Sequence, residues 1–283
     1  MFYSLNKPRG ISSFKAIKDF AKENNIKKIG HAGTLDPLAE GLLIVATDDD
    51  TKLLDFILGQ DKEYYVKATL HKSSASYDEG EEVKDLNYFK KITKSELKKV
   101  LKEIKKQTLQ IPPIFSAKKI NGQRAYDLAR QNKKVELKAN EIKIYSIKLI
   151  SFDYQNQSFI FKTKVSKGTY IRSMVHDIGI LLKTDAVTNI LKRISISSIK
   201  LNEKVNFNKI KVKNGLFNVS LYRLKKDELL SLIKGGSINK KLASDFNNKM
   251  IFKYNKKIVG YGVFENGKLL KRRLFISRLN SLV

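Results

Sequence analysis

The amino-acid sequence predicts an α+β fold, with a mixed, mainly antiparallel sheet flanked by helices and a small, mostly β unit at the C-terminus. Strand-like and helix-like segments mix along the chain without strict alternation, which disfavours a doubly wound parallel sheet. A polar, irregular stretch at about 204–218 is the expected linker between the two parts. The length of 283 residues fits one large and one small domain, which we expect at 1–212 and 213–283.

The first elements of the chain are a short strand at 2–6 and a helix that Ser12 or Ser13 caps. A polar loop containing two glycines follows at 30–37. The continuous apolar run at 41–47 is typical of a buried strand.

The next segments alternate between helix and strand patterns. Asp48 or Asp49 is expected to cap a helix, and 64–70 alternates as a strand. Thr93 and Glu96 form a capping-box pattern that opens a second helix.

A basic stretch follows the chain break at the two prolines 112–113, within an expected insertion at about 108–140. An Asn-Gly turn signal lies inside it. Its cationic side chains are Lys118, Lys119, Arg124, Arg130, Lys133 and Lys134.

The segments 142–152 and 159–166 have the composition of paired strands. A glycine turn at 167–169 leads into a helix with one apolar face, and 190–199 returns as a strand. Beyond the linker lie a short helix and several strands, and Asn266-Gly267 is a strong hairpin signal.

The charge of the chain favours a polyanionic partner. Lys and Arg number 56 against 28 acidic residues, a formal net charge of +28 at pH 7. A Lys-rich composition explains part of this excess. No long basic amphipathic helix with an aromatic face is present, so we expect nucleic acid rather than a membrane surface as the partner.

The absence of cysteine excludes disulfides, thiolate zinc sites and thiol nucleophiles. The histidines, His31, His71 and His176, are scattered along the sequence, so a histidine metal cluster is not expected. The N-terminal residues lack the build of a signal peptide, and no apolar run approaches the ~20 residues of a membrane span. We therefore expect a cytoplasmic protein.

Asp36 stands on the glycine-bearing loop directly before Pro37. Proline holds the preceding residue in an extended conformation, and a carboxylate on such a stiff loop can act as a nucleophile. The alternative is a helix N-cap, because aspartate before proline is also a common helix start.

His31 and Tyr64 each have a structural and a functional interpretation. A loop histidine is usually solvated, but in an RNA-binding protein it can stack on a base or wedge a helix open. Of the adjacent tyrosines 64 and 65, one is expected to face the core. The alternative is a ring that stacks on a flipped base.

The segment 167–172 combines a glycine turn, a helix start and a cation. Such a turn can bind phosphate, which makes Lys167 an RNA-binding candidate. Arg172 lies at the helix start, where a cation opposes the helix dipole, so it is expected to have a carboxylate partner elsewhere. The alternative is an ordinary exposed arginine.

Together these segments closely resemble the TruB-type family of tRNA pseudouridine synthases. Residues 2–10, with Asn6-Lys7-Pro8-Arg9-Gly10, are similar to the first motif of the family. The stretch 30–43, Gly-His-Ala-Gly-Thr-Leu-Asp-Pro-Leu-Ala-Glu-Gly-Leu-Leu, matches its signature segment almost throughout. The segments 167–172, 191–193 and 111–119 match further parts of the family pattern, so the resemblance covers nearly the whole chain.

The resemblance implies a role for each matched residue. Asp36 is implied as the nucleophile, Tyr64 and Arg172 as its catalytic partners, and Tyr170 and Leu191 as walls of the uridine pocket. Arg172 would pair with Asp36 and keep it ionised, holding both carboxylate oxygens. His31 would fill the gap left by the flipped base. The insertion, with Lys118, Lys119 and Arg124, is implied to grip RNA together with Lys167.

The implied activity is isomerisation of uridine 55 in the T loop of tRNA on a pseudouridine synthase sheet, followed by a PUA-like RNA-binding domain. Because nothing is oxidised or hydrolysed, no cofactor is expected, and a stand-alone monomer is the expected form. One departure concerns the loop 73–80, where Tyr77 stands at the position of a family aspartate.

Two alternatives remain at the level of sequence. A non-catalytic tRNA-binding or tRNA-folding protein on the same scaffold would fit the charge equally well. An enzyme of the guide-RNA-dependent branch is the other, although such enzymes usually carry long basic extensions.

Overall fold

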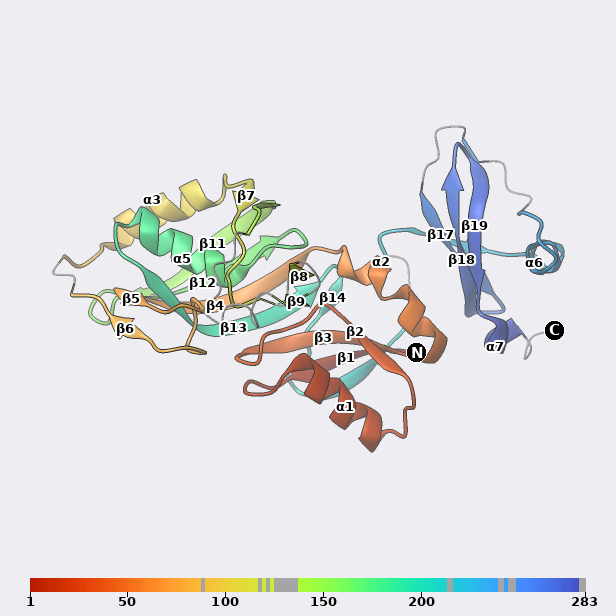
Figure 1. Ribbon diagram of the computed structural model, residues 1–283, viewed down its shortest axis with the longest axis horizontal. Helices are drawn as coiled ribbons and strands as arrows, with labels where there is room; N and C mark the ends of the chain where they lie inside the picture. Colours follow the sequence, from red (N-terminus) through yellow and green to blue (C-terminus); the bar gives the residue numbers. More distant parts are fainter. Residues whose placement is uncertain are drawn as a thin grey trace.

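The computed structural model describes residues 1–87, 90–116, 119–120, 123–124, 137–212, 216–238, 242–243 and 248–279. A large sheet with helices occupies the N-terminal part, and a smaller strand-rich unit follows at the C-terminus (Figure 1). Among these residues no helix has the length and apolar character needed to cross a membrane. The α+β fold with a mainly antiparallel sheet, predicted from the sequence, is confirmed by the strand pairing described below.

The main sheet has nine strands in the order β11-β12-β4-β13-β3-β1-β15, with β14 beside β13 and β2 beside β3. All of these pairs are antiparallel except β13 and β3, which run parallel at the centre. The strands are β1 (Phe2–Lys7), β2 (Ile29–Ala32), β3 (Ala39–Thr47), β4 (Lys62–Leu70), β11 (Ile144–Asp153), β12 (Ser158–Val165), β13 (Ala186–Ile196), β14 (Ile199–Lys200) and β15 (Phe207–Ile210).

Helices pack on this sheet through the apolar faces that their sequences predict. Helix α1 (Ser13–Glu23) is capped by Ser12, whose hydroxyl accepts from the Lys15 amide, and it packs on β1 and β3. Helix α3 (Lys94–Ile104) begins with the predicted capping box. Together with α5 (Ile171–Leu181) it covers β4 and β12, and a single apolar cluster joins these elements.

Short two-stranded pieces lie at the edge of this core. They are β5 (Lys72–Ser73) with β6 (Lys84–Asp85), β7 (Leu109–Gln110) with β10 (Asn140–Glu141), and β8 (Lys119–Ile120) with β9 (Gln123–Arg124).

Three details differ from the sequence-based expectation. The helix expected from Asp48 or Asp49 is a 3-10 turn, η1 (Asp48–Leu53), followed by the short α2 (Asp55–Leu58). No side chain caps η1; Asp48 has a positive φ of 55° and Asp49 pairs with Lys52 instead.

The other two differences concern edge strands. The polar loop expected at 30–37 starts later, because β2 pairs with β3 as far as Ala32. Within the expected linker, β15 pairs with β1 and extends the main sheet. Edge strands such as β15 gain backbone hydrogen bonds while their side chains stay largely exposed, so they lack an alternating apolar pattern.

The C-terminal unit is a four-stranded sheet of β16 (Ser220–Arg223), β17 (Lys249–Tyr254), β18 (Lys257–Glu265) and β19 (Lys268–Leu274). Helices α6 (Lys226–Ile233) and α7 (Ile276–Leu279) accompany it. The predicted Asn266-Gly267 hairpin joins β18 and β19, with both residues at positive φ.

This unit has its own core and also shares one with the larger part. Its own cluster is built around buried residues such as Leu229, Phe252 and Val259. A second cluster joins Phe217 and Phe275 to residues of β1, η1, α2 and β3. At the same junction Arg278 donates to both oxygens of the buried Asp50, at 3.0 and 2.8 Å.

Candidate active site

The loop that carries Asp36 is held on both sides of that residue. Gly33, with φ +88°, turns the chain out of β2. The buried Ser13 hydroxyl both donates to the Leu35 carbonyl and accepts from its amide, at 2.9 and 2.8 Å. The Pro37 carbonyl accepts from the Gly10 amide at 2.8 Å. Since β3 follows at Ala39, Asp36 caps no helix, and the helix-start interpretation is wrong.

Arg172 pairs with Asp36, as the sequence predicts. It lies in the first turn of α5 and is only 4% exposed. Its Nε and Nη2 both approach Oδ2 of Asp36 at 2.9 Å. The expectation that the guanidinium holds both carboxylate oxygens is therefore wrong: its contacts converge on one oxygen.

Two nitrogens of Arg172, Nη1 and the Nη2 that also approaches Asp36, donate to backbone carbonyls. Nη1 donates to the Ser76 carbonyl at 2.6 Å, and Nη2 donates to the Phe115 carbonyl at 2.9 Å. The guanidinium therefore joins the Asp36 loop to the loop after β5 and to the segment after β7. Three segments distant in the sequence converge on one planar group.

A second carboxylate at Arg172 was missed by the sequence analysis. Asp78 is buried, and its Oδ2 lies 3.5 Å from Nε of Arg172. Its Oδ1 accepts from the Ser76 hydroxyl at 2.5 Å and from the Gly80 amide at 2.9 Å. The sequence did contain a signal for it, since Asp78 directly follows Tyr77, the residue that differs from the family pattern.

Tyr77 itself points elsewhere. It has a positive φ of 60° and stacks on His176, with ring centroids 4.1 Å apart and an interplanar angle of 9°. The carboxylate that this loop places at Arg172 belongs to Asp78, the residue after Tyr77.

Tyr64 and Leu191 lie beside the Asp36 loop. Tyr64 is 8% exposed on β4, where it is opposite Arg193 of β13. Leu191 is opposite Ala39, at the start of β3. Both belong to the apolar cluster that contains Leu35 and the α5 residues, so Tyr64 is a buried tyrosine close to the candidate nucleophile.

Tyr170 precedes α5 and is held by its backbone. The buried Gln110 accepts from the Tyr170 amide at 2.8 Å and donates to its carbonyl at 3.0 Å. Burial raises the pKa of the Tyr170 phenol. Gln110 therefore supports the site from β7, which the sequence analysis did not identify.

His31 is a half-buried residue of β2, opposite Val45 of β3. Burial, aided by the positive charge of Arg193, lowers its pKa below the ordinary value, so the ring is neutral at pH 7. Its Nδ1 is buried and, within the described ranges, has no hydrogen-bond partner.

The expected RNA-binding residues are only partly placed. Lys167 is exposed in the turn before α5, beside Gly168 with φ +79°. Lys119 and Arg124 lie on the hairpin of β8 and β9, and Lys118 is outside the described residues.

Lys7 forms a buried support under the Asp36 loop. Its ammonium donates to the carbonyls of Pro8, Ile11 and Pro37 at 2.8, 2.6 and 3.3 Å. Burial lowers its pKa to about 8, and the charges of Asp36 and Glu40 oppose that shift. Within the described ranges no group of three or more histidine, aspartate and glutamate side chains is placed to hold a metal ion.

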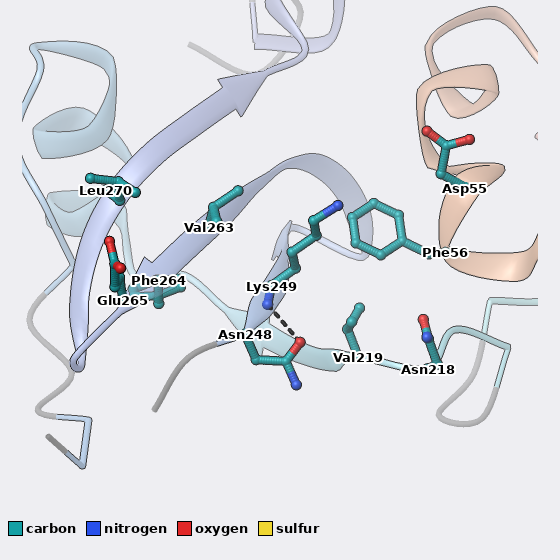
Figure 2. A pocket seen from close by; sticks show the side chains of 10 residues that line it. All are labelled: Asp55, Phe56, Asn218, Val219, Asn248, Lys249, Val263, Phe264, Glu265 and Leu270. Carbon is teal, nitrogen blue, oxygen red and sulfur yellow. Dashed lines mark hydrogen bonds between the residues drawn. The ribbon is translucent and has the colours of Figure 1, made fainter. Parts of the chain in front are cut away.

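A hollow of about 610 Å³ lies away from these residues, between α2 and the C-terminal unit (Figure 2). Its walls include Phe56, Val219 and Leu270, and the Lys249 ammonium lies 5.3 Å from the Phe56 ring centroid. None of the candidate catalytic residues lines it, so this hollow is not the site around Asp36.

Comparison with known proteins places this geometry in a family. The model of the TruB family pseudouridylate synthase N-terminal domain matches residues 21–171. A tRNA pseudouridine synthase B of Mycoplasmopsis pulmonis is 42% identical over 280 residues, covering 99% of this chain and 96% of the relative. The enzyme of that name from Aquifex aeolicus is 33% identical, covering 96% of this chain and 98% of the relative.

Solved structures agree on the fold. A chain in the crystal structure of a Cbf5-Nop10-Gar1 complex has a TM-score of 0.70 at 20% identity, covering 96% of this chain and 82% of that chain. At this identity the likeness concerns the fold alone. On the family match and the near full-length relatives, the chain belongs to the TruB family of pseudouridylate synthases.

Proposed function

We propose that this protein isomerises uridine 55 in the T loop of tRNA to pseudouridine, with Asp36 as the reacting carboxylate. The observation that carries the proposal is the Asp36 carboxylate, fixed by the buried Arg172 and bordered by Tyr64 and Leu191. The relatives that align over nearly the whole chain are named tRNA pseudouridine synthase B, which supports tRNA as the substrate.

The reaction rearranges one nucleotide without gain or loss of atoms. The bond between N1 and C1′ breaks, the uracil turns, and C5 bonds to C1′. C5 loses a proton and N1 gains one. Asp36 attacks the sugar or the base, or assists a glycal intermediate, and all of these routes use the same carboxylate.

The position of Arg172 suits this chemistry. Because its hydrogen bond goes to Oδ2, the other oxygen of Asp36 is left for the reacting nucleotide. The Asp36 side chain is 39% exposed, so a nucleotide can reach it. Arg172 itself is 5% exposed in its side chain and is shielded from bulk water.

The neighbouring residues would hold the detached base. Tyr64 would stack on the uracil and assist removal of the C5 proton, and Leu191 and Tyr170 would wall the pocket. His31, neutral and half-buried, would fill the gap left by the flipped nucleotide, since flipping costs a few kcal/mol of unstacking.

The basic parts of the chain would hold the rest of the tRNA. We assign 1–212 as the catalytic domain, with an RNA-gripping insertion at about 108–140, and 213–283 as a PUA-like RNA-binding domain. Affinity should fall with salt by a slope near the number of phosphates neutralised. The triple variant of Lys118, Lys119 and Arg124 to alanine should show a shallower slope, with Lys167 as a further phosphate contact.

We also propose that the enzyme acts in the cytoplasm as a monomer, without guide RNA, cofactor or obligate protein partner. The alternative of a non-catalytic tRNA-binding protein is disfavoured by the joint presence of Asp36, Tyr64 and Arg172. Binding tRNA requires phosphate and base contacts, and it does not require a carboxylate paired with a buried arginine.

The test is to incubate the purified protein alone with an unmodified tRNA transcript and to map pseudouridine along it. We expect product at uridine 55, and none when that uridine is replaced by cytidine. Asp36→Asn should bind tRNA normally and form no product. Activity of this variant within about tenfold of wild type, or ~1.4 kcal/mol at the barrier, would contradict the assignment of Asp36. Binding without product by the wild type would favour the non-catalytic alternative.

A further inference from the structure

Arg193 is a fully buried arginine at the centre of the main sheet. It is 1% exposed on β13 and lies opposite Tyr64 of β4 on one side and Gly41 of β3 on the other. In the described part of the chain it forms no salt bridge with a carboxylate. Burying an arginine without a paired acid is unfavourable, so its charge calls for an explanation.

The guanidinium of Arg193 ties together the two ends of the loop that carries Asp36. Nη2 donates to the carbonyl of Gly33, the first residue of the loop, at 2.9 Å. Nε donates to the carbonyl of Leu42, in the strand β3 that follows the loop, at 2.8 Å. One rigid planar group from a different strand therefore sets the span of the loop.

Two glycines, Gly33 at the start of the loop and Gly41 in β3 after it, lie against Arg193. A Cβ at Gly41 would lie 2.5 Å from the Arg193 carbonyl oxygen, a distance that real Cβ atoms do not show. A Cβ at Gly33 would lie 3.4 Å from Nη1 of Arg193. The close approach of β3 to the Arg193 backbone therefore requires glycine at position 41, while Gly33 is required for its positive φ of 88°.

Arg193 also lies beside Tyr64. The two residues are cross-strand partners, so their side chains leave the same face of the sheet. Burial lowers the pKa of Arg193, and the neighbouring Tyr64 side chain and the charge of Asp36 oppose that shift. A neutral amide side chain could also donate to two carbonyls, but it would not place a fixed positive charge near Asp36 and Tyr64.

We propose that Arg193 is a positioning residue for pseudouridine formation, which fixes the Asp36 loop at both ends and orients the Tyr64 hydroxyl toward the target nucleotide. It touches no substrate in this scheme and acts through Asp36 and Tyr64. The inference rests on the proposed function and adds a residue to its machinery.

The test compares two single variants of Arg193, Arg193→Lys and Arg193→Met. Tyr64→Phe alone and the double variant Arg193→Met with Tyr64→Phe complete a double-mutant cycle. Single-turnover rates at saturating tRNA, tRNA affinity and thermal unfolding are measured for each, with Lys102→Ala on the exposed face of α3 as the control. Lysine keeps the charge but cannot span the two carbonyls that Arg193 joins. We expect both single variants to lose about a hundredfold or more in rate, with affinity within about threefold of wild type.

Coupling to Tyr64 separates positioning from general support of the fold. Tyr64→Phe removes the hydroxyl of the residue that lies opposite Arg193 in the sheet. If Arg193 acts through that hydroxyl, Tyr64→Phe should cost much less in the Arg193→Met background than in the wild type. A purely structural role would make the two losses multiply.

Several results would overturn the inference. Arg193 variants with wild-type rates at saturation, rate losses that merely follow weakened binding, or independent losses at Arg193 and Tyr64 would each do so. If neither single variant folds, Arg193 serves stability and the inference is wrong. An inactive wild type would contradict the proposed function itself, and this inference with it.

Discussion

Replacing Arg172 with lysine keeps one positive charge at the site and removes the planar group that carries it. In the wild type, Nε and Nη2 meet Oδ2 of Asp36 at 2.9 Å, while Nη1 and the same Nη2 donate to the carbonyls of Ser76 and Phe115 at 2.6 and 2.9 Å. These acceptors belong to three segments. A single ammonium nitrogen on a flexible stem cannot serve all of them with fixed directions.

The magnitude follows from the contacts that lysine gives up. One charge-assisted hydrogen bond to Asp36 is worth up to ~3 kcal/mol, which at the barrier is about 10²-fold in rate. One buried carbonyl left without a donor costs a further ~2 kcal/mol of stability. For a chain of this size that corresponds to a melting temperature lower by about 4–8 °C.

The assay is a single-turnover rate at saturating tRNA, measured beside a filter-binding isotherm and a thermal melt of the same variant. Affinity should change little, because one contact among many to phosphate contributes a small share. If Arg172→Lys weakens binding in proportion and leaves the saturated rate unchanged, Arg172 is a phosphate clamp and not the partner of Asp36. Arg9→Lys, at an exposed surface ion pair with Glu79, is a control for the same substitution without burial.

Three further predictions address the supports of the site. Asp78→Asn should lower the single-turnover rate about tenfold, because an amide no longer offsets the charge of Arg172 at 3.5 Å; an unchanged rate would contradict a role for this carboxylate. Because the pKa of Lys7 is about 8 in the fold against 10.5 as the ordinary value, the unfolded chain binds more protons between these values. The free energy of unfolding of the wild type should therefore rise by about 1–3 kcal/mol relative to Lys7→Met as pH rises through that window. Denaturant titrations at several pH values measure it, and a fall in the relative stability would contradict the prediction. Removing 213–283 should lower the melting temperature by about 10–20 °C, because roughly 5 kcal/mol of burial at the shared cluster is lost; an unchanged melt would show that the larger part is self-sufficient.

The truncation prediction departs from what the sequence suggested. A short polar linker before a strand-rich region indicates two separately cored domains. In the structure the smaller unit has its own core, yet Phe217 and Phe275 also pack against Phe56 and its neighbours. The contact between the two units could not be predicted from the sequence. Each apolar surface has the same residue pattern as a segment packed within its own domain.

Local signals in the sequence were sufficient for several elements. Ser12 caps α1, Thr93 and Glu96 form the capping box of α3, and Asn266-Gly267 closes a hairpin, each as predicted. These features depend on hydrogen bonds between residues three or four positions apart. The residue types at those positions therefore determine whether the cap or turn forms. The stiffness of the Asp36 loop is of the same kind, since glycine and proline act on their own backbone.

By itself, then, the sequence determined the candidate nucleophile, the expectation that Arg172 has a carboxylate partner, and the mixed character of the sheet. Tertiary structure alone decided how the partner binds and what surrounds it. Arg172 and Asp36 are 136 residues apart, and their contact on one oxygen depends on α5 packing beside the strands that hold the loop. Asp78 reaches the same guanidinium, and Arg193 reaches both ends of the loop, because sheet register brings distant backbone segments together. Strands that are far apart in the sequence share no turn to fix their register, which follows from burying their apolar faces together, so no short stretch of residues encodes it.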